Sequence, residues 1–186
     1  SIHTNLQNAG SGLSVDSGSV VLAGTRTEHA ASNLAGTNKP WNRDNDWHYA
    51  DARMNVEVHE GASFELGSHA RLTGTVTVNE GGTYIMREGV QSRYEYIEGG
   101  YKLEDTYAID GFYGHKGDTV LNGTMQIEFS DGTSSNLTYS GNISGSGNMT
   151  VDTADGTFTL TGNNTFTGTK ELLHGHLIAD DVTALG

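Results

Sequence analysis

An internal repeat of about twenty residues constrains the fold of this chain more than any other feature of its sequence. The segments VEVHEGASFEL (56–66) and VTVNEGGTYIM (76–86) place valines, Glu-Gly, an aromatic and a large aliphatic residue at matching offsets. Apolar and polar residues alternate in both, which predicts short strands with one buried face, joined at a glycine with positive φ. Two such strands cannot bury a face alone, so the repeat predicts units that stack on one another.

Looser copies of the same unit recur along the chain, as LSVDSGSVVLA (13–23), GTMQIEF (123–129), MTVDTADGTFTL (149–160) and LLHGHLIA (172–179). A leucine-rich repeat would need its own Leu/Asn signature, a propeller blade needs about 40 residues, and an immunoglobulin-like sandwich shows no self-similarity. The fold class we expect is all-β, a parallel β-helix. Its stacked core positions are expected to be Val56, Val58, Phe64, Leu66, Val76, Val78, Tyr84, Met86, Phe158 and Leu160.

Two segments interrupt the period. Residues 25–53 are polar and contain the only proline and both tryptophans, which predicts a loop or excursion between units. Residues 87–118 are rich in tyrosine and charge, and they fit either a hairpin extension or a unit with a wide turn. The clearest repeats lie in residues 121–186. We therefore expect one domain over residues 1–186, with excursions at about 25–53 and 87–118.

The composition excludes several classes of site. Ten basic residues against 23 acidic residues give a net charge of −13, which argues against nucleic acid or an anionic membrane as a partner. The chain has no cysteine, so it has neither disulfides nor thiolate zinc sites. Only 34% of its residues are hydrophobic, which suits many small buried ladders better than one thick core. No apolar run is long enough to span a membrane as a helix.

The last 51 residues, NLTYSGNISGSGNMTVDTADGTFTLTGNNTFTGTKELLHGHLIADDVTALG (136–186), carry a more specific pattern. The pieces YSGNISGSGNMTV, TLTGNNTFTGT and LLHGHLIADDVTALG resemble the autotransporter-associated β-strand repeat. That repeat occurs in passenger domains of bacterial proteins secreted by the type V route. The one departure is Gly168-Thr169-Lys170, where the family often has Gly-Gly-Thr.

The resemblance implies a single right-handed parallel β-helix that crosses the periplasm and is displayed on the surface of a Gram-negative bacterium. It implies a stalk within a larger adhesin, protease or self-associating protein, with a role in adhesion or virulence and autochaperone-like support of passenger folding and secretion. The missing acid, base and nucleophile constellations predict that this stalk is non-enzymatic. The implied partners are the rest of the passenger, a C-terminal outer-membrane β-barrel, and a host surface or a second passenger. We expect no catalytic residues, metal or cofactor, and the sequence does not name a receptor.

A polysaccharide-active β-helix enzyme is the alternative function. His174, His176, Asp180 and Asp181 supply the residue types that such enzymes use, but the histidines precede the acids and no Arg-x-Lys follows. We interpret them as polar residues around a turn glycine. The asparagines of the Asn-x-Ser/Thr sequons are interpreted as turn residues or as ladders along the stack. They are Asn122, Asn136, Asn142, Asn148 and Asn163.

Aromatic residues mixed with charges are the best candidates for a binding surface, because such mixtures are typical of recognition sites. The alternative is that the tyrosines only pack across neighbouring strands. The candidates are Tyr94, Tyr96, Tyr101, Tyr107, Phe112 and Tyr113 in the second excursion, and Trp41 and Trp47 in the first.

Overall fold

The structure of the chain is a computed structural model that describes residues 12–26, 47–48, 50–88, 90–97, 100–108, 114–130 and 135–186. For residues 25–26, 47–48, 90–97 and 100–108 it describes the backbone alone. Nearly all of the regular structure is parallel β-sheet, and the one helical turn described is the 3₁₀ segment η1 (Val182–Leu185). The all-β prediction is therefore confirmed.

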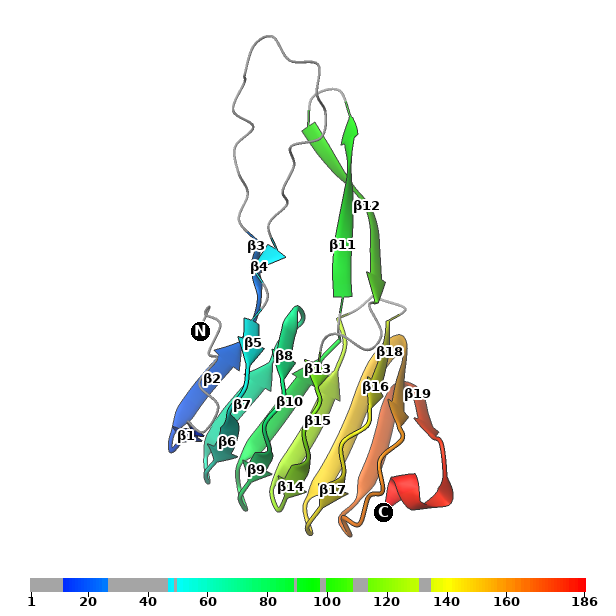
Figure 1. The fold of residues 1–186 in the computed structure, drawn as a ribbon. Helices are drawn as coiled ribbons and strands as arrows, with labels where there is room; N and C mark the ends of the chain where they lie inside the picture. Colours follow the sequence, from blue (N-terminus) through cyan, green and yellow to red (C-terminus); the bar gives the residue numbers. More distant parts are fainter. Residues whose placement is uncertain are drawn as a thin grey trace.

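Three open parallel sheets contain most of the strands, which follow one another side by side from the N-terminal to the C-terminal part (Figure 1). Sheet 1 contains, in order, β1 (Gly12–Val15), β6 (Asn55–Val58), β9 (Val76–Val78), β14 (Thr119–Leu121) and β17 (Ile143–Ser144). Sheet 3 contains β5 (Ala50–Ala52), β8 (Ala70–Leu72) and β13 (Gly114–His115).

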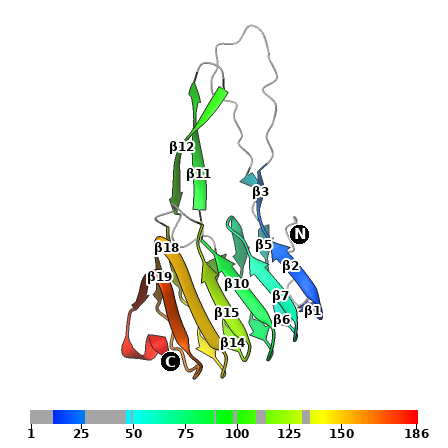
Figure 2. The ribbon, with the colours of Figure 1, turned by 180° about the vertical axis from the view of Figure 1, so that it is seen from behind.

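Sheet 2 is the widest, and seen from behind its strands form the near face of the stack (Figure 2). It contains β2 (Gly18–Leu22), β7 (Ala62–Leu66), β10 (Thr83–Arg87), β15 (Thr124–Glu128), β18 (Asn148–Leu160), β19 (Lys170–Ala179) and β16 (Asn136–Tyr139). The first part of β18 pairs with β15, its last part pairs with β16, and β19 pairs with both parts.

Equivalent residues of successive strands form ladders that fill the core. In sheet 2 the register aligns Val20, Phe64, Tyr84, Met125 and Met149 in one ladder, all but Val20 buried. A second ladder contains Leu22, Leu66, Met86, Ile127 and Val151, and all five are buried. In sheet 1, Val56 pairs with Val76 and Val58 with Val78. Each strand buries only a small apolar surface in a ladder, and the buried apolar surface adds up along the stack.

Turn glycines join the paired strands. Gly61 and Gly81 have φ of +73° and +77°, which is the left-handed conformation that the Glu-Gly turns predict. At Gly74 a Cβ would overlap the Met54 carbonyl oxygen, because the backbones of successive units touch there. Side chains are excluded at that contact by the short distance between units.

Both excursions leave the stack at the same corner, after a strand of sheet 2 and before a strand of sheet 3. The first lies between β2 and β5 and begins and ends in the antiparallel pair β3 (Thr25–Arg26) and β4 (Trp47–His48). The second lies between β10 and β13 and is an antiparallel hairpin, β11 (Val90–Ile97) and β12 (Gly100–Ala108), which projects from the stack (Figures 1 and 2). Of the two arrangements open for this segment, the hairpin is the one observed.

The excursions are shorter than the sequence predicts. Ala50–Ala52 is strand β5 of sheet 3, Arg87 ends β10, and β13 resumes the parallel pairing at Gly114. The strands of sheet 3 have two or three residues, which is too short for an alternating pattern to show in the sequence.

Candidate functional site

The β11–β12 ribbon holds four of the eight predicted aromatic residues. Its register places Tyr96 directly opposite Tyr101 and Tyr94 opposite Leu103, with a bulge between Arg93 and Tyr94. Successive residues of a strand alternate between its two faces, so Tyr94, Tyr96 and Tyr101 occupy positions on one face of the ribbon. Tyr107 pairs with Gln91 and occupies the other face.

The same register places the charged residues that have a partner on one face, together with Gln91, Tyr107 and Ile97, and leaves Glu104 unpaired at the bulge. We call the face that contains the Tyr96–Tyr101 pair the tyrosine face. Its positions are Val90, Ser92, Tyr94, Tyr96, Tyr101, Leu103, Thr106 and Ala108, and none of them is ionisable near neutral pH. The opposite face places Arg93 across from Asp105 and Glu95 across from Lys102, two pairs of opposite charge. The ribbon is thus amphipathic, although the sequence of each strand mixes charged and aromatic residues.

Of the other predicted aromatic residues, one lies among the described residues, in a separate pair of strands. Trp47 lies in β4, where it pairs with Arg26. Trp41, Phe112 and Tyr113 lie outside the described residues. The described members of the sequence-predicted cluster are therefore divided between the two faces of the ribbon and a separate pair of strands.

A second candidate is a row of charged side chains on the outer face of sheet 2. Arg87, Glu128, Asp152 and His174 are register partners on four successive strands, β10, β15, β18 and β19. The Arg87 guanidinium donates to Glu65 at 3.1 Å and lies 2.8 Å from Glu128. His174 Nδ1 lies 3.2 Å from both carboxylate oxygens of Asp152. The two acids stand side by side, with a basic group at each end of the row.

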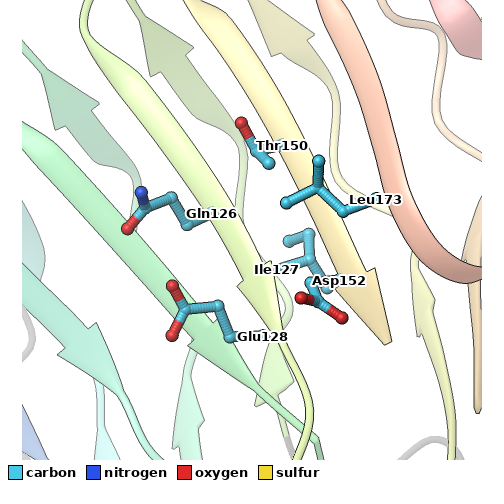
Figure 3. Close-up of a pocket in the computed structure, with 6 residues that line it drawn as sticks. All are labelled: Gln126, Ile127, Glu128, Thr150, Asp152 and Leu173. Carbon is cyan, nitrogen blue, oxygen red and sulfur yellow. The ribbon is translucent and has the colours of Figure 1, made fainter. Parts of the chain in front are cut away.

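A shallow cavity of about 190 Å³ opens beside these acids. Figure 3 shows Gln126 and Glu128 on one strand, Thr150 and Asp152 on the next, and Leu173 pointing toward the space between Thr150 and Asp152. Leu173 is the extra residue of a bulge, because Val151 pairs with Leu172 and Asp152 with His174. Small-molecule sites usually have roughly 300–1,000 Å³, so this hollow is too small to enclose such a ligand.

The suspected histidine and aspartate constellation is not assembled. His174 is 71% exposed and contacts Asp152, not Asp180 or Asp181. The Asp181 carboxylate caps η1 by accepting from the Thr183 amide and hydroxyl, which lowers the pKa of this carboxyl. Gly175, between the two histidines, has a positive φ of 84° and lies within the long strand β19.

A buried polar cluster lies where the chain returns from the hairpin to the stack. His115 follows Ala52 and Leu72 in the inward ladder of sheet 3, at a position where the repeat predicts an apolar residue. Its ring lies edge-on to Tyr84 and 5.4 Å from Tyr139 between centroids. His115 Nε2 donates to the Gly74 carbonyl at 2.7 Å, and burial lowers the pKa of His115 to about 4.

The two tyrosines around His115 differ in whether their hydroxyls have a hydrogen-bond partner. Tyr139 donates to the Gly117 carbonyl and lies 2.8 Å from the Thr119 hydroxyl. The Tyr84 hydroxyl is buried and has no hydrogen-bond partner among the described residues. Burial raises the pKa of both tyrosines. The alternating pattern does not reveal this cluster, because His115 stands in a two-residue strand and Thr119 in a three-residue strand.

Three of the five sequon asparagines, Asn122, Asn142 and Asn148, accept through Oδ1 from a backbone amide of the next unit. Asn142 Oδ1 accepts from the Asn163 amide at 2.9 Å, and Asn148 Oδ1 accepts from the Thr169 amide at 2.9 Å. Asn164 is buried, accepts from the Ile143 amide at 2.7 Å and donates to the Ala184 carbonyl. Each bond joins one unit to the next, so these side chains hold the turns in register.

Within the described ranges, no group of three or more histidine, aspartate or glutamate side chains is arranged to hold a metal ion. The same part of the chain contains no helix with the length and apolarity needed to cross a membrane. In the comparisons with known proteins, no family model, no curated protein and no solved structure matches this chain.

Proposed function

We propose that this chain is a single right-handed parallel β-helix that serves as a non-enzymatic extracellular stalk of an autotransporter passenger. The observation that supports it is a recurring strand order. The groups β5–β7, β8–β10 and β13–β15 each deliver one strand to sheet 3, one to sheet 1 and one to sheet 2, in that order. A β-helix is the simplest fold in which consecutive strands visit the same three sheets in turn.

The proposal includes a role in folding and secretion. The described part of residues 121–186 contains no long insert, and β15, β18 and β19 pair in parallel one after another, with bulges between β18 and β19. A preformed unit offers a strand edge on which the preceding unit can pair, so folding can spread from this end. We propose that the segment thereby supports passage of the passenger through the periplasm to the cell surface, in partnership with the passenger's remainder and a C-terminal outer-membrane β-barrel. The hairpin then carries an adhesive or self-associating contact.

Surface display tests this function. The chain is fused ahead of an outer-membrane translocator in a Gram-negative host, and display is measured by antibody labelling and protease protection. Deletion of residues 136–186 should abolish display or leave the passenger protease-sensitive. Deletion of the hairpin residues 90–108, the matched control, should preserve display because the hairpin lies outside the ladders. Unchanged, protease-resistant display without residues 136–186 would contradict the folding role.

The charged row on sheet 2 is the one observation that favours the alternative, a polysaccharide-active enzyme. Glu128 and Asp152 are a side-by-side carboxylate pair with His174 against one member. Paired carboxylates of suitable separation act as acid and base or nucleophile in glycoside cleavage. Cleavage of a polysaccharide by the purified chain, lost in both Glu128→Gln and Asp152→Asn, would replace the stalk function with this one.

A further inference from the structure

His115 is a buried imidazole in β13, the next described strand after the β11–β12 hairpin. Its Nε2–H donates to the Gly74 carbonyl at 2.7 Å, and its Nδ1 lies 3.5 Å from the Thr119 hydroxyl. A carbonyl can only accept, so the neutral ring carries its proton on Nε2, and a second proton would enter at Nδ1. That proton would place a full charge in a buried position, which costs far more free energy than burial of the neutral ring.

The two rings beside His115 carry no charge that could balance this proton. Tyr84 of β10 lies edge-on to the imidazole, and Tyr139 of β16 lies 5.4 Å away between centroids. Burial raises the pKa of both tyrosine hydroxyls, so both stay neutral at acid pH. The attraction of an aromatic face for a cation is smaller than the cost of taking that cation out of water. The cluster therefore suits the neutral imidazole and not the imidazolium.

The charged residues near His115 are of mixed sign. Asp118 favours the protonated ring, but its carboxylate already accepts from the Asn142 amide at 2.8 Å. Lys116 disfavours the protonated ring, and Arg71 of β8 lies across the strand pair from the first residue of β13. The two ring nitrogens themselves face a carbonyl and a hydroxyl. A proton on His115 thus finds no ion-pair partner among these groups.

β13 is also the least firmly held strand of its unit. It has two residues, lies at the edge of sheet 3 and pairs only with β8 among the described strands. The Lys116 amide adds one bond, to the Leu72 carbonyl at 2.7 Å. Gly114 enters β13 with φ of +89°, a conformation that lets glycine turn the chain there. The following strands β14 and β15 each pair with a strand on both sides, so β13 can open with few bonds lost.

We propose that protonation of His115 releases β13 from sheet 3 while β14 and β15 stay paired. Opening of β13 brings the ring into water, where the charge is no longer buried, so acid favours the open strand. Burial lowers the pKa of His115 from 6.5 to about 4 in the closed strand, and the open strand therefore gains at every pH below 6.5. On the proposed function, this device makes the contact carried by the hairpin sensitive to acid. The release itself does not rest on that function.

Native-state hydrogen exchange of the whole chain at pH 7 and pH 5, followed by NMR, tests the proposal. After correction for the intrinsic exchange rate, the protection factor of the Lys116 amide should fall about twentyfold from pH 7 to pH 5, because opening is favoured about tenfold per pH unit below 6.5. The Thr124 amide of the same unit donates to the Gly82 carbonyl and serves as the reference. Lys116 should be at least about tenfold less protected than Thr124 at both pH values, because β13 opens before the unit unfolds.

Two variants assign the effect to His115. His115→Gln keeps an N–H donor and cannot be protonated, so the protection of Lys116 should change less than about twofold between the two pH values. His59→Gln, at a half-buried histidine beside Asp16, is the matched control and should keep the parent's fall. Where His115→Gln does not fold, the His115 ring signals of the parent are titrated instead, and their midpoint should lie well below 6.5.

Four results would overturn the proposal. They are equal protection of Lys116 and Thr124, no fall in the protection of Lys116 with acid, the same fall in His115→Gln as in the parent, and a His115 ring that titrates near its usual pKa. Equal protection of the two amides would mean that β13 opens only when the whole unit unfolds. Loss of surface display is a separate result, which refutes the stalk and not the release of β13.

Discussion

The rings of Phe64 and Tyr84 stack in adjacent strands of sheet 2, with centroids 5.8 Å apart and planes inclined by 24°. The two residues occupy the same position in successive repeats, and both are completely buried. The match between VEVHEGASFEL and VTVNEGGTYIM thus corresponds to a physical contact between equivalent side chains. Aromatic stacking of this kind adds about 0.5–1.5 kcal/mol beyond the area that the rings bury.

Replacement of the Phe64 ring should destabilise the stack strongly. Phe64→Ala removes a fully buried ring from the centre of a ladder, and we expect a loss of about 3–5 kcal/mol in the free energy of unfolding. Chemical denaturation of the whole chain measures it. Ser63→Ala, the neighbouring residue on the outer face, is the control and should change stability by less than about 0.5 kcal/mol.

Removal of the Tyr84 hydroxyl, unlike removal of the Phe64 ring, should leave the free energy of unfolding unchanged or raise it. Tyr84→Phe keeps the stacked ring and deletes a buried hydroxyl that lacks a hydrogen-bond partner among the described residues. A buried polar group without a partner costs about 1–3 kcal/mol, so the variant should be equally or more stable than the parent. A clear loss of stability in a thermal or chemical melt would show that the hydroxyl has a partner in solution.

Stability should fall as the pH falls from about 6.5 to about 4. The pKa of His115 is lowered by burial from 6.5 to about 4, so below 6.5 the unfolded chain binds a proton that the folded chain excludes. Lys116 lowers this pKa slightly, while Asp118 and the bond to the Gly74 carbonyl raise it. The stability contributed by neutral His115 is complete above 6.5, and about 3 kcal/mol is lost by pH 4.

Comparison of urea melts across this pH range isolates the contribution of His115. His115→Leu cannot titrate, and it continues the ladder of Ala52 and Leu72. This variant should lose most of the pH dependence in the range below 6.5. An unchanged pH profile in the variant would assign the acid sensitivity to other groups.

Loss of the Asn164 side chain should open the C-terminal turn. Asn164→Ala leaves the Ile143 amide and the Ala184 carbonyl without their side-chain partners in a buried place. We expect a cost of about 2–4 kcal/mol for the two bonds together, seen as faster hydrogen exchange at Ile143. Asn163→Ala, next along the chain and exposed, should cost much less.

The C-terminal half should be the first to fold and the slowest to open. The N-terminal half contains the two excursions, and long inserts raise the entropy cost of closing each unit. Native-state hydrogen exchange should therefore be slower for amides at Thr157–Leu160 than at Val76–Met86. The reverse order would rule out folding that spreads from the C-terminal end.

The ladders of sheets 1 and 2 could be predicted from the sequence because all of their strands but the two-residue β17 have three or more residues, most of them of alternating character. Sheet 3 could not be, since β13 has two residues and places His115 where an apolar side chain is expected. The row of Arg87, Glu128, Asp152 and His174 was also missed. Inserts of unequal length separate these residues along the chain, and only the register of sheet 2 aligns them.

The tyrosines were recognised as candidates, but their division between two faces was not. The bulge between Arg93 and Tyr94 shifts the pairing by one residue. Which residues lie opposite each other across the two strands is therefore set by this bulge, and it cannot be read from the spacing of the tyrosines along the chain. Charge and aromaticity alternate along each strand, so a mixed sequence yields a ribbon with separated faces.

The shared corner of the two excursions has a consequence for how this chain can change. Residues added between a strand of sheet 2 and the following strand of sheet 3 leave every ladder in place, because parallel pairing resumes in the same register on both occasions. At this corner the chain can therefore gain residues without any change in the length of the stack. An engineer could graft foreign loops there with the ladders as a constant frame, and natural variants can acquire new surfaces by the same route.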